Sequence, residues 1–464
     1  MEIFKKGSIS FLYNILGGIL GFAIQFFAAK ILGASEFGKY NYFMGLVNTF
    51  GLLFTFGVAF YFPKIFQNKI DKRALTSGIF YTSTILLLIT FPLIILFNKF
   101  SSQLEYFLFF LMTLSIISLK FYSAYLAAIG RFDLSTKKTN FLVRFISLVI
   151  FLIFIMFFSK SQYELIFATF IANVIIVAPF LWKKLKIIKP NIVFIKKAYI
   201  FYFIQIFYMF FGEYSKVLQG DFFNYKSVAY LSIALLIGQS ITLFGLNFAN
   251  VGMPIFANAF AKNDIKTIRI KFKEISRINA FFLIPVFFVI FFNSNLILGL
   301  FGNEFTQGVL MLKLILVGAF FNSIVGPNGT VLLMGNKSYL ELFNGILKFV
   351  VVVATVYLFG EKYLWGVALA ISLSDILVNL IKAIQVYYFY KIVPFSYKET
   401  IYIVIYGISV VIIFYISSIY FKNEIILILF NVIFVLLLWF WAFKLSPNKS
   451  DQILLKRLYF FRNS

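Results

Sequence analysis

Apolar stretches recur along the whole chain, and short polar connections separate them. A helix that crosses the hydrocarbon core of a bilayer needs about 20 mostly apolar residues, and fourteen stretches meet this requirement. We therefore predict an all-α polytopic membrane protein with fourteen transmembrane helices. The predicted spans are residues 8–30, 40–66, 74–97, 106–129, 141–158, 164–182, 198–219, 227–258, 278–299, 307–334, 339–359, 364–390, 400–420 and 425–443.

Polar residues interrupt these stretches at helical spacing, most clearly in LAISLSDILVNLIKAIQVYYF (369–389). Asp375 and Lys382 are seven residues apart, which is about two helical turns, so both lie on one face. Asn379 lies near that face, and Ser372 comes one turn earlier. Charged residues inside a membrane usually face the bundle interior or a water-filled space. We therefore expect this polar stripe to face a water-filled path.

The composition narrows the class of protein. The chain is 62% hydrophobic and only 13% charged, whereas soluble proteins carry about a quarter charged residues. It has no cysteine and no histidine, which excludes disulfides, thiol catalysis and Cys/His metal sites. It has no Walker or GxGxxG motif, and its predicted outer loops are too short for the paired acids of a membrane glycosyltransferase or polymerase. We expect a transporter with no catalytic residue, no metal and no cofactor.

The Lys and Arg residues are distributed unevenly. If the N-terminus is cytosolic, the cytosolic segments contain 30 of the 42, and the outer segments contain seven. Because cytosolic loops are enriched in Lys and Arg, we predict that both termini are cytosolic. Topology and attraction to anionic membrane lipids then explain the net charge of +25, so no nucleic-acid partner is expected.

The two halves of the chain resemble each other. The matched positions are Tyr40 with Tyr230, Pro63 with Pro254, Pro92 with Pro285, and Gly130, Asn140 and Arg144 with Gly335, Asn344 and Lys348. Six predicted spans separate the partners, and because six is even, both copies have the same orientation. Parallel repeats are typical of transporters, which bind substrate near the bilayer midplane between the repeats.

This repeat predicts the domain organisation. We expect two parallel six-helix lobes, residues 1–197 and 198–399, related by an axis along the membrane normal. Residues 400–443 then form two additional transmembrane helices, and residues 444–464 form a basic cytosolic tail.

The opening segment KKGSISFLYNILGGILGFAIQFFAAKILGASEFGKYNYF (5–43) carries a resemblance. Its first span ends in Leu-Gly, and a short E-F-G-x-Y turn starts the second span. The residues of this pattern are Leu32, Gly33, Glu36, Phe37, Gly38 and Tyr40. The segment 130–132 and the turn FGNEF (301–305) are two further parts of the resemblance. The chain thus resembles the Wzx-type polysaccharide repeat-unit flippases of the multidrug/oligosaccharidyl-lipid/polysaccharide (MOP) exporter superfamily.

The resemblance implies that the two lobes form a V around a central cavity. It also implies a function, the movement of undecaprenyl-pyrophosphate-linked oligosaccharides from the inner to the outer leaflet of the bacterial plasma membrane. The polysaccharide made from them would be an O-antigen, a capsule or a similar surface polymer. The expected partners are the lipid-linked substrate, H+ or Na+ as coupling ion, membrane lipids, and a polysaccharide polymerase or ligase.

Two alternatives stay open, a lipid II flippase of the same superfamily and a cation-coupled multidrug exporter. The first predicted span has no charge between Lys6 and Lys30, whereas the resemblance implies a basic patch there in lipid II flippases. The positive charge of the presumed cavity argues against an exporter of cationic drugs.

We assign six cations and three acids to the membrane interior, counting Lys30, Lys64 and Glu164 near span ends as outside it. Each costs roughly 2.5–3.5 kcal/mol at a helix centre, and a net positive cavity suits a pyrophosphate that must leave water. We expect Lys348 to make the main contact with the head group, with Lys120 and Arg144 nearby. The candidate head-group residues are Lys348, Lys120, Arg144, Lys382, Lys313 and Lys216.

Amide side chains inside the spans are suited to bind sugar hydroxyls. The candidates for glycan contact are Asn14, Gln25, Asn48, Asn247, Asn344 and Asn379. Because histidine is absent, a coupling proton or sodium ion must use a carboxylate. Asp375 is our first candidate for ion coupling, and Glu213 and Glu341 are the reserves.

Structural roles are the alternative for the same charges. Lys382, Lys216 and Lys313 are close enough to span ends to extend towards the membrane surface. Asp375 with Lys382, and Glu341 with Lys348, are candidate ion pairs that only fix helix packing.

Small residues predict local backbone features. Gly17 and Gly18 are expected to let another helix approach the first span closely. The GPNG sequence at 326–329 predicts a break or hinge in the tenth span.

The distribution of basic residues predicts a topology that cysteine labelling can test. The native chain has no cysteine, so single cysteines report without background. We expect cysteines at positions 190 and 268, in the two most basic loops, to resist an impermeant thiol reagent added to intact cells. Labelling from outside at either position would contradict the cytosolic assignment.

Overall fold

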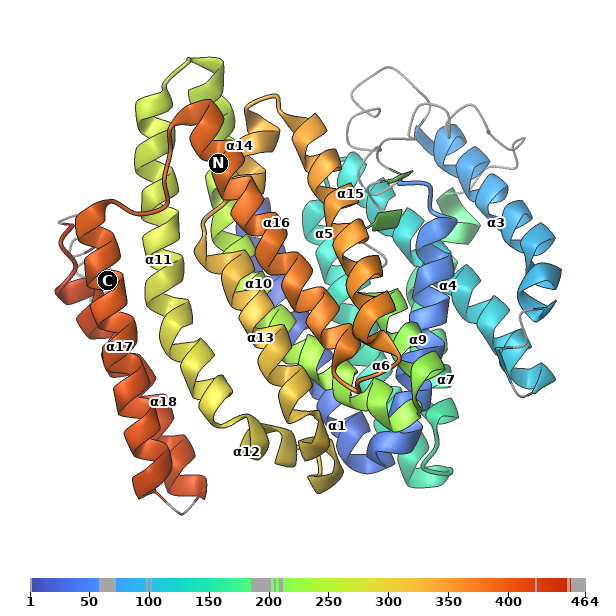
Figure 1. The fold of residues 1–464 in the computed structure, drawn as a ribbon. Coiled ribbons are helices and arrows are strands. Elements are labelled where there is room, and N and C mark those ends of the chain that lie inside the picture. The colour runs from blue at the N-terminus through green and yellow to red at the C-terminus, as the bar shows by residue number, and fades with distance from the viewer. Residues whose placement is uncertain are drawn as a thin grey trace. The chain divides into compact units, whose positions relative to one another are not determined.

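The structure is a computed structural model that describes residues 2–57, 72–96, 99–100, 102–184, 202–203, 206–207, 212–421, 424–448 and 451. Across these residues the regular elements are all helices (Figure 1). Eleven of them are long and apolar enough to cross a membrane, which confirms the prediction of an all-α polytopic membrane protein.

The helices follow the predicted spans. They are α1 (Glu2–Leu53), α3 (Lys72–Leu96), α4 (Gln103–Ala128), α5 (Phe132–Thr136), η1 (Lys137–Leu142), α6 (Val143–Phe157), α7 (Gln162–Lys184), α9 (Glu213–Phe222), α10 (Tyr225–Ala261), α11 (Ile265–Phe292), α12 (Ser294–Gly299), η2 (Asn303–Gly308), α13 (Val309–Ile324), α14 (Asn328–Met334), α15 (Ser338–Thr355), η3 (Val356–Gly360), α16 (Gly366–Tyr390), α17 (Tyr397–Tyr420) and α18 (Glu424–Lys444).

Two glycines mark where long apolar stretches change direction. Gly33 has φ of 73° inside α1, so α1 consists of two helical segments that match the first two predicted spans. Gly326 has φ of 90°, and a Cβ there would lie 2.3 Å from the Ser276 hydroxyl. Both the backbone conformation and the space therefore require glycine. The helix breaks between α13 and α14 at this point, which confirms the predicted break.

The chain divides into two compact units, Met1–Ser232 and Ile233–Ser464. Within the first unit, α4 packs against α3 and α7, and α7 packs against α6. Within the second unit, α13 packs against α11 and α16, and α16 packs against α15. The same neighbours thus recur in the order that the internal repeat predicts.

The turn before the fifth helical span of each repeat has a shared backbone feature. Gly130 follows α4 with φ of 78°, and Asn336 follows α14 with φ of 58°. A left-handed residue just after a helix is a common helix ending, and glycine and asparagine adopt it most readily. The correspondence supports a duplication, although it matches Gly130 with Asn336 and not with Gly335.

The helix α9 packs against α1 in the first unit. Ten of the 22 residues of the predicted span 198–219 lie outside the described residues. The predicted lobes, 1–197 and 198–399, and the tail at 444–464 therefore stay predictions.

The last two helices pack against α11 within the second unit (Figure 1). A cluster of buried apolar side chains joins them, including Phe281 of α11 and Phe414 of α17. The Tyr406 hydroxyl donates a hydrogen bond of 3.1 Å to the Phe281 carbonyl. The Trp439 indole of α18 donates one of 3.2 Å to the Phe282 carbonyl. Apolar packing and two directed hydrogen bonds therefore hold α17 and α18 in place.

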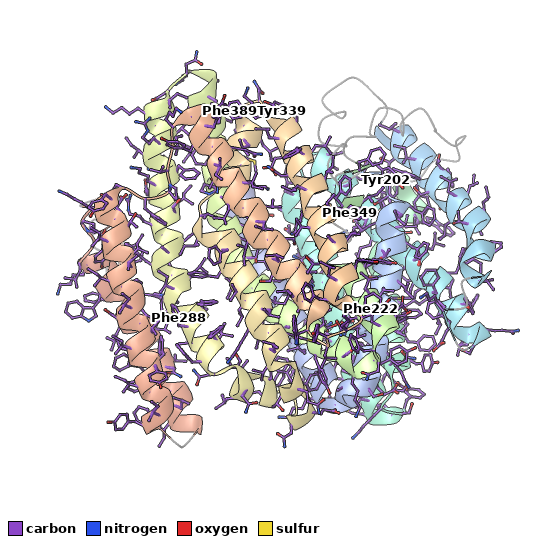
Figure 2. All side chains as sticks on the ribbon, in the orientation of Figure 1. Tyr202, Phe222, Phe288, Tyr339, Phe349 and Phe389 are labelled. Atoms are coloured by element: carbon purple, nitrogen blue, oxygen red, sulfur yellow. The ribbon has the colours of Figure 1, made fainter. Side chains whose placement is uncertain are left out.

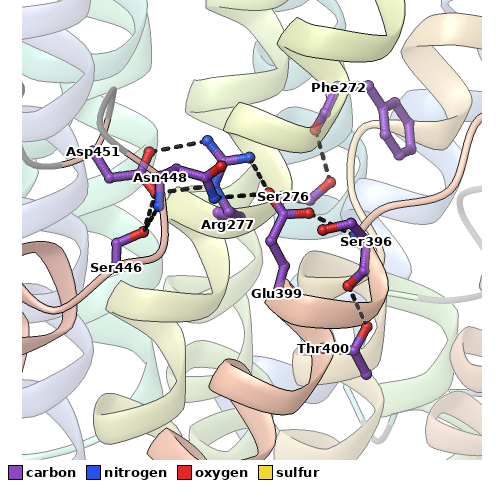
Figure 3. A network of polar contacts seen from close by, with 9 residues as sticks. All are labelled: Phe272, Ser276, Arg277, Ser396, Glu399, Thr400, Ser446, Asn448 and Asp451. Carbon is purple, nitrogen blue, oxygen red and sulfur yellow. Dashed lines mark hydrogen bonds and ion pairs between the residues drawn. The ribbon is translucent and has the colours of Figure 1, made fainter.

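A buried charged network strengthens the same junction (Figure 3). The Arg277 guanidinium of α11 donates to Glu399 of α17 at 2.7 Å and to both carboxylate oxygens of Asp451 at 2.9 and 3.0 Å. Asn448 also donates to Glu399, and Ser446 donates to Asp451. The three charged side chains are 7% exposed or less. One arginine thus joins α11, α17 and the segment that follows α18.

This network gives a stability prediction. Arg277→Met removes the cation and leaves two buried carboxylates facing each other. Breaking a buried ion pair by removing one partner costs about 3–5 kcal/mol, so we expect a loss of ~3 kcal/mol. The midpoint of thermal unfolding in detergent measures it.

The matched control is Lys271→Gln on the same helix. Lys271 pairs with Glu274 at 2.7 Å, but its side chain is 40% exposed. Exposed pairs contribute less than about 1 kcal/mol, so the midpoint should barely move. Equal effects of the two substitutions would contradict a special role for Arg277.

The fold also refines the labelling test. Ile268 is fully buried, so a cysteine there would resist the reagent on either side of the membrane. Lys262 is exposed in the same loop region and replaces it as the labelling position.

Candidate functional site

The helices α15 and α16 carry most of the intramembrane charge of the second unit, and they pack against each other. Lys348 Nζ of α15 lies 2.6 Å from Asp375 Oδ1 of α16. Lys382 Nζ of α16 lies 2.8 Å from Glu341 Oε2 of α15. The four side chains are 12–17% exposed. Two ion pairs therefore join the helices, each running from one helix to the other.

These partners differ from the expected ones. The sequence suggested pairs along a single helix, Asp375 with Lys382 and Glu341 with Lys348. In the structure each lysine instead has its carboxylate on the neighbouring helix, because the antiparallel packing brings opposite charges to the same level. The Lys382 ammonium is thus held at Glu341, which corrects the expectation that it extends to the membrane surface.

An amide pair lies on the same helix interface. Asn344 Nδ2 donates to Gln385 Oε1 at 2.8 Å, and Gln385 Nε2 donates to Asn344 Oδ1 at 3.0 Å. Asn344 is 1% exposed. Because each amide satisfies the other, Asn344 is committed to helix packing in this conformation and not presented to a glycan.

Glu341 has one oxygen that these contacts leave unused. Oε2 accepts the bond from Lys382, whereas Oε1 is buried and receives no hydrogen bond from the described residues. A Cβ at Gly329 of α14 would lie 3.2 Å from this oxygen. An unsatisfied buried acceptor costs about 1–3 kcal/mol, so the site would gain from a proton or a cation.

The predicted polar stripe of α16 does not face one common path. Ser372 is 2% exposed and packs on α13, where a Cβ at Gly318 would lie 2.7 Å from its Cα. Asp375 and Lys382 instead face α15. Asn379 donates to the Asp375 carbonyl at 2.9 Å, within its own helix. Most of the stripe is therefore occupied by helix–helix contacts.

In the first unit, the side chain of Arg144 packs closely against two glycines of α1. Arg144 Nη1 donates a 2.6 Å hydrogen bond to the Gly17 carbonyl. A Cβ at Gly21 would lie 2.8 Å from the same nitrogen, and a Cβ at Gly17 would lie 3.0 Å from the Asn140 side chain. The close packing expected at Gly17 is confirmed, whereas Gly18 has no heavy atom within 4 Å of such a Cβ.

Lys120, Glu213 and Arg144 form a second group of charges in this unit, close enough to interact electrostatically. Glu213 accepts bonds from Lys216 at 3.1 Å and from Asn48 at 3.4 Å. Lys120 is exposed within the unit. Among the described residues, no carboxylate lies within 4.0 Å of Lys120 or Arg144. Neither cation therefore forms an ion pair with a described carboxylate.

The remaining predicted residues have individual settings. Lys313 lies over the Phe291 ring, 5.1 Å from its centroid. Asn14 accepts a 2.8 Å hydrogen bond from Asn140. Gln25 is half-buried on α1. The side chain of Asn247 lies outside the described part of the structure.

Sequence reasoning missed three residues of these networks. Gln385 follows Lys382 by three positions, so helical spacing would have found it on the same face. Asn140 was aligned with Asn344 but was not selected as a site residue. Arg277 gave no local signal, because its partners are 122 and 174 positions away.

The fold resembles solved structures of membrane transporters. The lipid II flippase MurJ, in an inward closed conformation, aligns with a TM-score of 0.73 at 16% identity, over 95% of this chain and 98% of that one. An inward-facing multidrug-resistance MATE-family transporter of the MOP superfamily aligns with a TM-score of 0.58 at 14% identity, over 82% and 94%. A mutant of the Vibrio cholerae MATE transporter VcmN aligns at 0.55 and 16% identity, over 84% and 97%.

No protein-family model matches the sequence, and no curated protein matches it. At these low identities the structural similarity establishes the fold alone, which this chain shares with MurJ and with the two MATE-family transporters.

Proposed function

We propose that this protein moves an anionic lipid-linked oligosaccharide, an undecaprenyl-pyrophosphate repeat unit, from the inner to the outer leaflet of the bacterial plasma membrane. The observation that carries the proposal is the pair of cations Lys120 and Arg144. Glu213 and Arg144 both act on Lys120 electrostatically, but no carboxylate of the described residues lies within the 4.0 Å of an ion pair with either cation. Two cations that form no ion pair favour a ligand that brings its own negative charges, and the similarity to a lipid flippase supports a lipid-linked one.

This assignment shifts the main head-group contact from Lys348 to Lys120 and Arg144. In the second unit, Lys348 and Lys382 are neutralised by Asp375 and Glu341. An exporter of cationic drugs would need uncompensated carboxylates instead, and the acids of these pairs are occupied by lysines.

A lipid II flippase is the second candidate, because the likeness to MurJ extends over nearly all of both chains. The absence of charge in the first span between Lys6 and Lys30 favours the polysaccharide repeat unit. The flipped product would then serve a polysaccharide polymerase or ligase outside the membrane.

We also propose that the two ion pairs between α15 and α16 couple transport to an ion gradient. Opening of the α15–α16 interface would free Asp375 from Lys348 and let it bind H+ or Na+. Glu341 is the reserve with the clearest structural support, because its Oε1 has no donor among the described residues. Glu213 is bonded to Lys216 and Asn48, so a coupling role there would require both to leave.

Removal of either of the two cations, Lys120 or Arg144, should slow flipping. In proteoliposomes with a fluorescent undecaprenyl-pyrophosphate oligosaccharide, we expect Lys120→Gln and Arg144→Gln each to slow transfer by roughly 10- to 100-fold. Hydrogen bonds to charged groups contribute about 1.5–3 kcal/mol, which gives this range. Protection of the label from an outside quencher measures the rate.

The controls distinguish an effect of the lost charge from an effect on folding. They also distinguish the oligosaccharide repeat unit from lipid II as the substrate. Lys362→Gln changes an exposed lysine in the turn before α16 and should leave flipping unchanged. Arg144→Lys keeps the charge and should retain part of the activity. Normal flipping by both Gln variants would overturn the proposal. Faster transfer of lipid II than of the repeat unit would favour the second candidate.

The coupling role of Asp375 is tested together with its partner. We expect Asp375→Asn to leave flipping indifferent to imposed proton or sodium gradients, because the amide at position 375 is neutral and cannot take up the ion as a carboxylate does. The measurement is the flipping rate in vesicles with each gradient in turn.

The double variant Lys348→Gln with Asp375→Asn removes both charges at once. If the pair only fixes packing, the double variant should recover gradient-dependent transport, because no uncompensated charge is left buried. If Asp375 carries the ion, the double variant should stay uncoupled. Recovery would assign the pair to packing.

A further inference from the structure

Two lysines at one end of the α15–α16 pair lie over aromatic rings. Lys337 Nζ lies 4.7 Å from the centroid of the Phe389 ring and 5.8 Å from that of Tyr339. Lys391 Nζ lies 5.1 Å from the Tyr387 ring centroid. Figure 2 shows Tyr339 and Phe389 together at this end. The charge distribution of the sequence places this end at the cytosolic surface.

These two lysines differ from Lys348 and Lys382, which lie about two and a half to three helical turns further along the same helices. Among the described residues, no carboxylate lies within 4.0 Å of Lys337 or Lys391. The nearby Glu341 is bonded to Lys382. The aromatic faces stabilise the ammonium groups but do not neutralise them. Two positive charges therefore remain at the surface.

Backbone geometry fixes the positions of both lysines. Asn336 and Lys391 have left-handed φ angles of 58° and 53°, so each lysine sits at a tight helix end. The Tyr390 hydroxyl donates to the Gly335 carbonyl at 3.0 Å, which ties the start of α15 to the end of α16. The two lysines are thus held on one preorganised surface.

The rings of this surface are accessible. Tyr388 is 69% exposed, Tyr339 56%, Tyr387 52% and Phe389 38%. Tyrosine rings and lysine side chains of membrane proteins sit at the level of the lipid head groups. Basic groups beside transmembrane helices on the cytosolic side attract anionic lipids. Exposed rings with uncompensated ammonium groups therefore fit a lipid phosphate and the upper part of its chains.

We propose that Lys337 and Lys391, with the rings of Tyr339, Tyr387 and Phe389, bind the phosphate head group of an anionic phospholipid at the cytosolic surface. The lysines bond the phosphate oxygens, and the rings pack on the glycerol and upper acyl groups. This site is separate from Lys120 and Arg144, which lie in the other unit, and it does not depend on the proposed function.

A fluorescent phosphatidylglycerol titrated onto the purified protein in detergent tests the proposal. Each lysine near an anionic surface contributes about five-fold to binding. We therefore expect Lys337→Gln with Lys391→Gln to weaken the apparent affinity by roughly 25-fold. Unlabelled phosphatidylglycerol should displace the probe, and phosphatidylcholine should not.

The matched control is Lys362→Gln, an exposed lysine at the opposite end of α16, which should bind the probe as the native protein does. Phe389→Ala keeps both charges and should weaken binding less than the double variant. Equal affinity of the double variant and the native protein, or equal displacement by phosphatidylcholine, would overturn the proposal. So would displacement by inorganic pyrophosphate at the same concentration as phosphatidylglycerol, because the site would then recognise phosphate without lipid.

The flipping assay distinguishes failure of the phospholipid-site proposal from failure of the proposed flippase function. The double variant retains Lys120 and Arg144, so it should lose phosphatidylglycerol binding while it still flips substrate in vesicles of neutral lipid. Loss of flipping there together with loss of binding would show that the lysines serve the transported substrate, and would overturn the phospholipid assignment.

Discussion

A charged side chain inside the bilayer is not solvated by water and therefore needs a partner of opposite charge. This constraint determines how α15 and α16 pack against each other. Lys348, Asp375, Lys382 and Glu341 would each cost roughly 2.5–3.5 kcal/mol alone at a helix centre. Pairing between the helices at 2.6 and 2.8 Å offsets this cost. A slide of α15 along α16 by one turn would break both ion pairs and the amide pair at Asn344 together. The charges therefore set the register of the two helices, which apolar packing alone specifies poorly.

In the first unit, Lys120 and Arg144 are not paired with described carboxylates of a neighbouring helix. Arg144 is seated on the backbone of α1 through the Gly17 carbonyl, so a neutral group fixes its position and its charge is retained. Lys120 likewise has no carboxylate within 4.0 Å among the described residues. In the first unit, Lys120 and Arg144 thus form no ion pair with a described carboxylate. In the second unit, Lys348 and Lys382 are neutralised by Asp375 and Glu341. This asymmetry separates a candidate site for substrate anions from a candidate site for a coupling ion.

The fold tolerates wide change in sequence. At 16% identity the apolar surfaces of MurJ and of this protein pack into similar arrangements, because hydrophobic residues of similar size can replace one another. Directed contacts are less replaceable. Arg277 joins α11 to Glu399 and Asp451, so the helices that follow the repeat are attached by a geometry that only a few side chains satisfy.

The sequence by itself determined what local chain properties control. Length and hydropathy predicted the membrane helices, and the GPNG sequence predicted the break at Gly326, because these features depend on neighbouring residues alone. It also placed the charges at the right positions on each helix. Only the tertiary structure decided their partners. Lys348 and Asp375 are 27 positions apart, Glu341 and Lys382 are 41, and Arg277 and Asp451 are 174. Such pairs depend on the register between separate helices, and that register follows from packing that no single helix encodes.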